Sequence, residues 1–335
     1  MAAVASDWRK PPSFFRSFFR TDTSTSRMID IMVQRGLEKI ATDVIRGTEG
    51  NRNTWKTATM KEFDPPYFRE YFDVTELECY DAFFTGAPVT PARFARFIKE
   101  AAQKVEALKD KIRRTYELQC SQVLHDGVVQ FNKGIDIDFK RQTASKRVVG
   151  AGNWWTEAAI DPETILQEGL EFIRGQGKSP DYRFNVICGD QAFAGYRNNT
   201  AVKARNQQFN SNTQFLNPAQ ANAAGGVAHG WTSCGSYILD WWTYPSTYDD
   251  DSGNQVKFMD PKSIIIVPHN PDFVMAHAAV PQLIGANGAA QLFQGEFMTS
   301  HHIDEWNAQE MFDVKSVGLA VPVLVDQIFT AQVIS

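Results

Sequence analysis

The sequence predicts an α+β protein in which several segments extend beyond any core of their own. A continuous helix pattern runs from Pro91 to His125, far longer than a compact domain needs. An aromatic N-terminal arm and a two-stranded ribbon come before this helix and lack the apolar residues to bury themselves. A separate block of alternating helix and strand patterns covers residues 151–268, and strand patterns fill residues 269–335.

Composition fits an ordinary folded protein made in the cytoplasm. The 335 residues are 43% apolar and 22% charged, enough for one large core or two domains that share one. The formal net charge of −5 shows no basic bias for sequence-specific nucleic-acid binding. We expect no secretory signal, no membrane span, and reduced thiols without a zinc site or disulfide framework. The four widely spaced cysteines are Cys79, Cys120, Cys188 and Cys234.

The arm, within residues 1–33, carries four aromatic side chains in six positions. The stretch "PPSFFRSFFRTDTSTS" places Phe14, Phe15, Phe18 and Phe19 beside two arginines, after a double proline. These rings are too apolar for a solvated tail. Two interpretations remain open: a short helix docked on the chain's own core, or an arm docked on a neighbouring subunit, which we favour because the flanking segments can reposition it.

Residues 34–75 read as a long two-stranded excursion. Strand-like composition begins just before it in "MIDIMV" and returns in "TWKTATMKEF", with a turn-rich "GTEGNRN" between them. Asp64-Pro65-Pro66 excludes helix and forces an extended path. An isolated ribbon is marginal in water, so we expect it to lie on another surface.

The helix from Pro91 to His125 has one apolar stripe. Thr90 can cap its N-terminus, Pro91 suits the first helical position, and Asp126-Gly127 marks its end. Its length is about 50 Å at about 1.5 Å per residue. A single stripe indicates that one side packs while the other is wet or contacts partners.

A hairpin with two aspartates follows the helix. Residues 128–131 and 135–139 form the strands, and Asn132-Lys133-Gly134 forms the loop. Asp136 and Asp138 alternate with Ile135, Ile137 and Phe139, as they do on any half-buried strand. We therefore predict a solvated strand face, with no catalytic carboxylates.

The block over 151–268 combines helices and strands. We predict a helix over 161–174, a strand and short helix through "YRFNVICGDQAFAGYRNN", and a buried strand at Ile264–Val267. Residues 205–226 read as a long polar loop. Residues 237–244 and 255–259 are predicted to pair as a hairpin around "PSTYDDDSGN".

No motif in the sequence carries recognisable chemistry. "GQGKSP" lacks the first glycine and the flanking elements of a phosphate-binding loop. "HHIDE" at His301–Glu305 places two histidines side by side, where they diverge, and reads as an exposed turn. "DDDSG" lacks the ligands of a calcium loop. We expect no enzyme, no cofactor and no metal.

The order of parts resembles the tailed-bacteriophage major capsid fold (the Hong-Kong-ninety-seven-like fold), and within it the lambda-type major capsid protein E family. The likeness covers essentially the whole chain. It rests on four stretches in order: "PSFFRSFF", "ELQCSQVLHDGVVQFNKGIDIDF", "FNVICGDQAFAGYRNNTAVK" and "GNQVKFMDPKSIIIVP".

The resemblance implies a domain plan. Residues 1–33 correspond to the N-terminal arm and 34–75 to an extended loop that overlaps a neighbouring subunit. Residues 76–150 correspond to a peripheral domain whose spine helix is 91–125. Residues 151–268 correspond to an axial α/β domain, and 269–335 complete the peripheral domain.

The resemblance also implies a function: a structural protein that self-assembles from pentamers and hexamers into an icosahedral phage head shell around the genome. Portal, scaffold and possible decoration proteins are the implied partners, with weak, non-specific contact with packaged double-stranded DNA and none with membrane. An encapsulin-type compartment shell that encloses cargo enzymes is the alternative. Residues expected at subunit contacts are Phe14, Phe15, Phe18, Phe19, Trp55, Tyr248 and Asp250.

Overall fold

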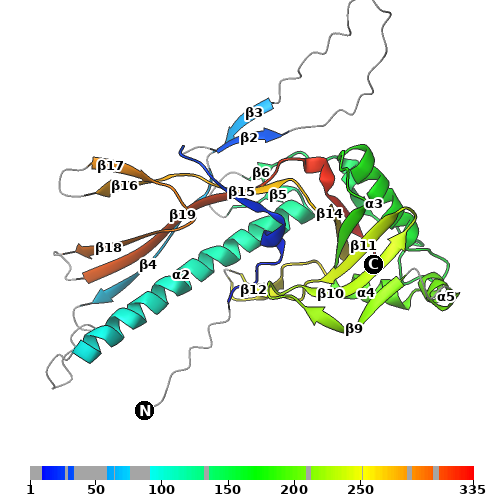
Figure 1. Cartoon of the computed structure of the whole chain (residues 1–335), viewed down its shortest axis with the longest axis horizontal. Helices are drawn as coiled ribbons and strands as arrows, with labels where there is room; N and C mark the ends of the chain where they lie inside the picture. Colours follow the sequence, from blue (N-terminus) through cyan, green and yellow to red (C-terminus); the bar gives the residue numbers. More distant parts are fainter. Residues whose placement is uncertain are drawn as a thin grey trace, which may run out of the picture.

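Two β-sheets joined by one long helix organise the chain, as Figure 1 shows. This computed structural model describes residues 10–26, 29–33, 59–63, 65–75, 91–131, 136–208, 213–250, 252–284, 289–304 and 309–335. A five-stranded sheet lies beside the helix α2 (Pro91–His125), and a seven-stranded sheet with its own helices lies at the helix C-terminus. The α+β fold class predicted from the sequence is confirmed.

The long helix has the bounds that its sequence pattern predicts. Its C-terminal half presents a buried face to the core: Ile112, Tyr116, Cys120, Val123 and Leu124. The helix ends where Gly127 adopts a φ of 69°, and the Gly127 N–H donates to the Val123 carbonyl at 3.0 Å. Glycine is the residue that takes this left-handed conformation without strain, which explains the sharp stop.

The five-stranded sheet is built around one long strand, β19 (Gln309–Pro322). Its second half pairs with β15 (Phe273–His277), which pairs in parallel with β1 (Arg20–Thr23) of the arm. Its first half pairs with β18 (Met298–Asp304) on one edge and β4 (Tyr67–Thr75) on the other. The arm is thus an integral strand of this sheet.

The seven-stranded sheet has the order β7-β20-β14-β8-β11-β10-β9. Its edge strand β7 (Lys146–Val148) and the next strand β20 (Phe329–Gln332) come from outside the 151–268 block. One face packs on the helix α3 (Glu163–Gly175), with Leu166, Leu170 and Ile173 fully buried. Residues 269–335 therefore contribute to both sheets, with β20 in this one and β15, β18 and β19 in the five-stranded one.

The remaining elements are short. They are η1 (Phe15–Phe18), β2 (Ile29–Val33), β3 (Thr59–Phe63), β5 (Val128–Val129), β6 (Ile137–Asp138), η2 (Thr143–Ser145), β8 (Arg183–Cys188), α4 (Asp190–Asn198), α5 (Thr200–Gln208), β9 (Thr213–Ala221), β10 (Val227–Cys234), β11 (Tyr237–Thr243), β12 (Thr247–Asp249), β13 (Gln255–Lys257), β14 (Ser263–Pro268), β16 (Val280–Ile284), β17 (Ala289–Phe293) and η3 (Val325–Gln327).

Two sequence predictions in the middle block are wrong. The loop predicted over 205–226 contains the end of α5 and the strand β9, because β9 finds an antiparallel partner in β10. The strand near 237–244 pairs with β10 and β8, while the hairpin around residue 251 joins β12 and β13. The β11 backbone is satisfied on one side by β10, which comes directly before it, and on the other by β8, about 50 residues earlier, a pairing that local composition does not reveal.

The aspartate-bearing hairpin matches its prediction. β5 pairs with β6, with Val128 opposite Asp138, and Ile137 and Phe139 are buried while Asp136 and Asp138 are exposed. The predicted loop residues 132–134 lie outside the described residues. The ribbon strands β2 and β3 also pair, from Ile29 opposite Phe63 to Val33 opposite Thr59.

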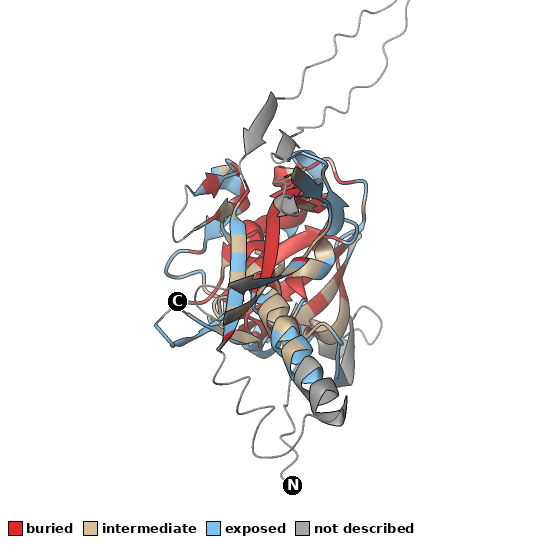
Figure 2. Cartoon of the chain, turned by 90° about the vertical axis from the view of Figure 1, so that its left-hand side faces the viewer, coloured by how far each residue is buried: buried red, intermediate tan, exposed pale blue. Residues whose placement is uncertain are grey.

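Arg141 joins the end of α2 to the seven-stranded sheet. Its guanidinium is buried and donates to the carbonyls of Leu124 and His125 at 3.1 and 2.9 Å, which otherwise end the helix without partners. The same group donates to the carbonyls of Ser145 and Ile328, each at 3.1 Å. Figure 2 shows the buried residues gathered where the helix and both sheets meet.

Candidate subunit-contact site

Three of the four arm phenylalanines are buried in the chain's own core. Phe14, Phe15 and Phe19 are 2%, 0% and 3% exposed, while Phe18 stays partly buried. Phe14 packs on Trp242 at 5.5 Å between ring centroids, and Phe15 meets Tyr244 edge-to-face at 4.9 Å. The rings therefore bridge the long helix and the end of β11.

Of the two interpretations of the arm, the structure supports docking on the chain's own core for these three rings. Their burial within one chain leaves almost no surface for another subunit, because the groove between α2 and β11 already covers them. Gly226 shapes this groove, since a Cβ there would lie 2.4 Å from the Phe14 ring. Phe18 keeps surface available for contact.

A buried carboxylate anchors the arm. Glu117 of α2 is 0% exposed, and its Oε1 accepts the Phe15 N–H at 2.7 Å and the Tyr244 hydroxyl at 2.8 Å. Its Oε2 accepts the Arg16 N–H at 2.9 Å. Burial raises the pKa of the Glu117 carboxyl to about 7, although these hydrogen bonds act in the opposite direction. Sequence reasoning missed Glu117, because its partners are 101 or more positions away.

His277 is a second buried titratable group near the arm. Its ring packs against the Tyr116 ring at 5.4 Å between centroids, and the side chain is 1% exposed. Burial, assisted by the Arg16 guanidinium, lowers the pKa of the His277 imidazole to about 4. The folded protein therefore resists protonation of this ring.

A pH dependence of stability follows from His277. Above about pH 6.5 neither the folded nor the unfolded imidazole is protonated, so its contribution to stability is complete. As the pH falls from 6.5 towards 4, the His277 imidazole is protonated in the unfolded state but stays neutral in the folded state. We expect this ring alone to cost up to about 3 kcal/mol of unfolding free energy.

The measurement is urea unfolding of the wild type and the His277→Asn variant between pH 4 and 8. The variant should lose less stability than the wild type across pH 6.5 to 4. His302→Asn, at an exposed position on β18, is the control and should keep the wild-type slope. Parallel profiles for His277→Asn and the wild type would contradict the expectation.

Tyr248 and Asp250 lie in the β12–β13 hairpin. Tyr248 packs against Phe258 at 4.9 Å between centroids, and the Asp250 carboxylate accepts the N–H groups of Ser252 and Asn254 at 2.9 and 2.7 Å. Hydrogen bonding, led by the contact with Asn254, lowers the pKa of Asp250. The Asp250 carboxylate is thus held by backbone N–H groups of its own hairpin. Trp55 lies outside the described residues.

Exposed aromatic residues that sequence reasoning did not single out lie on β4. Tyr67 and Tyr71 are 53% and 55% exposed and share one strand face, while Phe68 and Phe72 point to the opposite face. Phe68 meets Tyr116 of α2 at 5.7 Å, which fixes that opposite face as the inner one. The two Tyr-Phe pairs in "YFREYF", four positions apart, put both tyrosines on one strand face and both phenylalanines on the other, and this spacing is the signal that could have found the surface.

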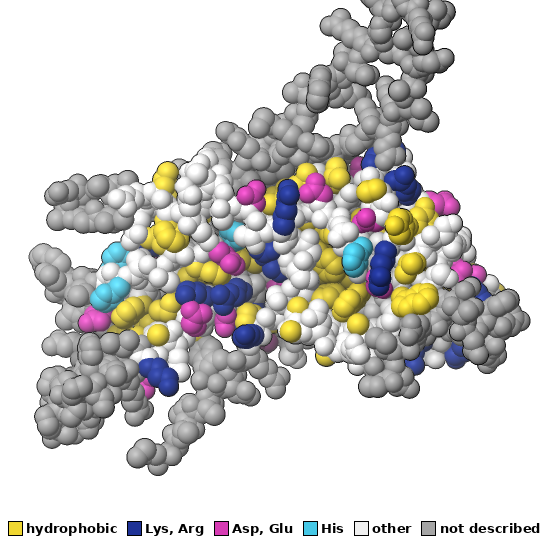
Figure 3. Space-filling view, in the orientation of Figure 1, with side chains coloured by type: hydrophobic (Ala, Val, Ile, Leu, Met, Phe, Trp, Pro, Cys, Tyr) yellow, Lys and Arg dark blue, Asp and Glu magenta, His cyan; other side chains and the backbone are white. Residues whose placement is uncertain are grey.

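A second apolar surface lies over β10 and β11, visible on the right-hand part of Figure 3. A hollow of about 220 Å³ is lined there by Trp231 and Trp242, with Arg183 and Asp240 beside them. The Arg183 Nε donates to Asp240 at 2.6 Å. This paired guanidinium leaves the surface aromatic and locally neutral.

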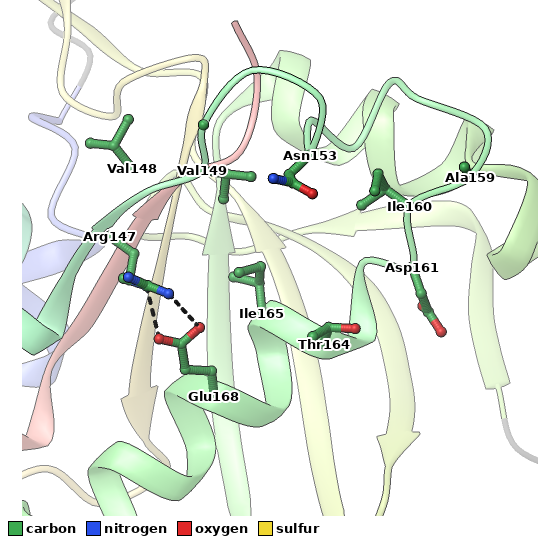
Figure 4. A pocket seen from close by; sticks show the side chains of 11 residues that line it. Arg147, Val148, Val149, Asn153, Ala159, Ile160, Asp161, Thr164, Ile165 and Glu168 are labelled. Carbon is green, nitrogen blue, oxygen red and sulfur yellow. Dashed lines mark hydrogen bonds and ion pairs between the residues drawn. The ribbon is translucent and has the colours of Figure 1, made fainter.

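A groove beside β7 is lined by paired charges and apolar side chains. It holds about 600 Å³ between β7, the following loop and α3, as Figure 4 shows. Its charged side chains pair with each other or with neighbours: Arg147 with Glu168 at 2.8 Å, and Asp161 with Arg205. Apolar Val148, Val149 and Ile165 form much of the rest. No nucleophile–base pair lies among these lining residues.

The histidine pair at 301–302 lies on the strand β18, which corrects the predicted turn. The whole of β18 pairs with β19, so His301 lies opposite Phe312 and His302 opposite Met311. Across the described part of the chain, no three His, Cys, Asp or Glu side chains are grouped to hold a metal ion. Among the helices that the structure describes, none is long and apolar enough to span a membrane.

Comparison with known proteins identifies the family. The model of the family "Phage major capsid protein E" matches residues 1–333. The crystal structure of a prophage capsid protein from Escherichia coli CFT073 is similar, with a TM-score of 0.61 and 17% identity, covering 98% of this chain and 96% of that one.

Capsid structures from other phages share the fold. The bacteriophage PhiM1 mature capsid has a TM-score of 0.51 and 12% identity, covering 99% of this chain and 90% of that one. The capsid of Cyanophage P-SCSP1u has a TM-score of 0.51 and 10% identity, covering 99% and 91%. No curated protein matches the chain. The chain belongs to the phage major capsid protein E family and is a structural protein of the phage head shell.

Proposed function

We propose that copies of this chain assemble as pentamers and hexamers into a closed icosahedral shell around a double-stranded DNA genome. The observation that carries the proposal is the family match over residues 1–333, together with a fold shared with phage capsids over nearly the whole chain. The shell forms in the host cytoplasm and becomes the head of the virion.

The domain roles follow the family plan. Residues 1–33 act as the arm, 34–75 as the loop that overlaps a neighbour, and 76–150 with 269–335 as the peripheral domain. Residues 151–268 act as the axial domain at the capsomer axis. The exposed Tyr67 and Tyr71 support this plan, because exposed aromatic side chains are common at protein interfaces.

We propose subunit contacts at Phe18, Trp55, Tyr248 and Asp250. Phe18 is the arm ring with free surface, and the Asp250 carboxylate is held by the Asn254 N–H on a hairpin whose residues 249 and 252–254 are exposed. Five or six copies of an acidic turn repel one another at short range, so the turn points outward from the axis or meets a cation. Phe14, Phe15 and Phe19 support these contacts indirectly, by fixing the arm.

The protein works by assembly, without catalytic chemistry of its own. Portal and scaffold proteins, and a decoration protein in some shells, are separate partners. The net charge of −5 favours weak, non-specific contact with packaged DNA, because tight binding to the inner wall would hinder packing and release. An encapsulin-type compartment is disfavoured by the family match.

Assembly of the purified chain tests the proposal. With scaffold supplied, we expect sedimentation to show large particles and electron microscopy to show closed icosahedral shells. Particles isolated from infected cells should contain nucleic acid, whereas cargo protein in its place would favour the compartment alternative. Monomers and dimers alone, with scaffold present, would count against shell formation.

The positions of two segments give a second test. We expect residues 206–226 or residues 248–254 to lie around the capsomer axis in an assembled shell. An electron microscopy reconstruction with subunits resolved measures this directly. A reconstruction that places both segments away from every five-fold and six-fold axis contradicts the assigned axial domain.

A further inference from the structure

We propose that Glu117 is a carboxylate latch that holds the N-terminal arm at the junction of the two sheets and takes up a proton as the arm docks. The inference concerns the single subunit and does not depend on shell formation. It goes beyond the role in the shell, because it assigns a residue that controls where the arm lies.

The geometry places one carboxylate between three parts of the fold. Glu117 belongs to the long helix, its two N–H donors are the consecutive residues Phe15 and Arg16 of η1, and Tyr244 follows β11 of the seven-stranded sheet. The two backbone donors are free because they open a helical turn, which leaves its first N–H groups without internal partners. Undocking of the arm removes two of the three donors at once.

The charge of Glu117 is met by dipoles and not by a bonded cation. The Arg16 guanidinium acts on Glu117 through its charge, yet it donates to the Phe19 carbonyl at 2.5 Å and to Thr21 Oγ1 at 2.6 Å. Among the described residues, Glu117 has no ion pair within 4.0 Å. A fully buried carboxylate without a cation binds a proton more readily than an exposed one.

The surrounding groups leave Glu117 as the one that titrates near neutral pH. Tyr244 and, on α2, Cys120 face it, and burial raises the pKa of both. Arg16 faces it from the arm, and also faces His277 on β15, whose pKa is lowered to about 4 by burial. The raised pKa of about 7 at Glu117 therefore lies alone between pH 5 and 9 in this cluster.

The difference in the pKa of Glu117 between the docked and the undocked arm makes docking depend on pH. The docked carboxyl has a pKa of about 7, against an ordinary 4.5 when the arm is undocked and water reaches it. Docking is therefore strongest below pH 4.5 and weakens as the pH rises through 7. Between pH 6 and pH 8 the docking equilibrium should fall about tenfold.

Hydrogen exchange of the unassembled subunit tests the latch. The probe is the peptide that carries residues 13–19, with rates corrected for the intrinsic pH dependence of amide exchange. In the wild type, its protection should fall about tenfold from pH 6 to pH 8, while the core strand β14 stays equally protected. In Glu117→Gln, which cannot ionise, the arm protection should be the same at both values.

Two further variants sharpen the result. Glu106→Gln, at an exposed position on the same helix, should keep the wild-type pH dependence. Tyr244→Phe removes a hydrogen-bond donor that lowers the pKa of Glu117. In this variant the midpoint of the pH-dependent loss of arm protection should therefore move to higher pH. If Glu117→Gln fails to fold, the shift expected in Tyr244→Phe still tests the proposal. The proposal is overturned by wild-type protection that does not change with pH, by a slope that persists in Glu117→Gln, or by an unmoved midpoint in Tyr244→Phe.

Discussion

Replacement of Arg141 by methionine is expected to lower the free energy of unfolding by about 3–5 kcal/mol. The side chain is 8% exposed, and its guanidinium donates to four backbone carbonyls, two of them at the C-terminal end of α2. Loss of the donor leaves these buried acceptors unsatisfied, at about 1–3 kcal/mol each. The total stays below their sum, because methionine also avoids the burial of a charge.

Urea unfolding followed by circular dichroism measures this change. Arg147→Met is the matched control, because Arg147 lies six residues further on, is 52% exposed and forms a surface pair with Glu168. That variant should lose less than about 1 kcal/mol. Arg141→Lys should lose most of the stability that methionine loses, since one ammonium cannot reach acceptors on opposite sides. Equal stability of Arg141→Met and Arg147→Met would refute the role of Arg141.

Replacement of Phe15 by alanine is expected to lower the free energy of unfolding by about 3 kcal/mol. Phe15 is fully buried and contacts Tyr244, so its loss removes apolar burial and leaves a cavity. Phe18→Ala is the control and should cost about 1 kcal/mol, because that ring is only partly buried. The arm is a terminal segment that can detach while the rest of the chain stays folded. The loss of unfolding free energy in Phe15→Ala therefore cannot exceed the free energy with which the arm docks.

A double-mutant cycle checks this limit. Phe14→Ala and Phe15→Ala together should cost less than the sum of the single changes, because either one can release the arm. Full additivity would show that the rings act as ordinary core residues. Stability unchanged by Phe15→Ala would show that the arm does not dock on its own chain. Electron microscopy of shells assembled from folded Phe18→Ala subunits then tests whether Phe18 also contacts another subunit.

Local signals in the sequence determined the elements that depend on near neighbours. The helix from Pro91 to His125 was predicted to the residue, because its stripe repeats every three to four positions and Gly127 ends it. Alternation with apolar residues predicts a solvent-exposed strand face for the aspartates at 136 and 138, because alternation alone decides the side of a strand. The family resemblance rested on the order of such elements, and the family match confirms it.

Only the tertiary structure decided the features that depend on distant partners. β8 pairs with β11, about 50 residues later, and β20 near the end of the chain pairs with β7 at residues 146–148. The arm docks on its own chain through the hydrogen bond from the Phe15 N–H to Glu117, which lies 102 positions away. Tyr244, 127 positions from Glu117, donates to the same carboxylate. A glutamate on a helix reads as a solvated charge until a separate segment covers it. Its burial is therefore a property of the packing, which no local pattern encodes.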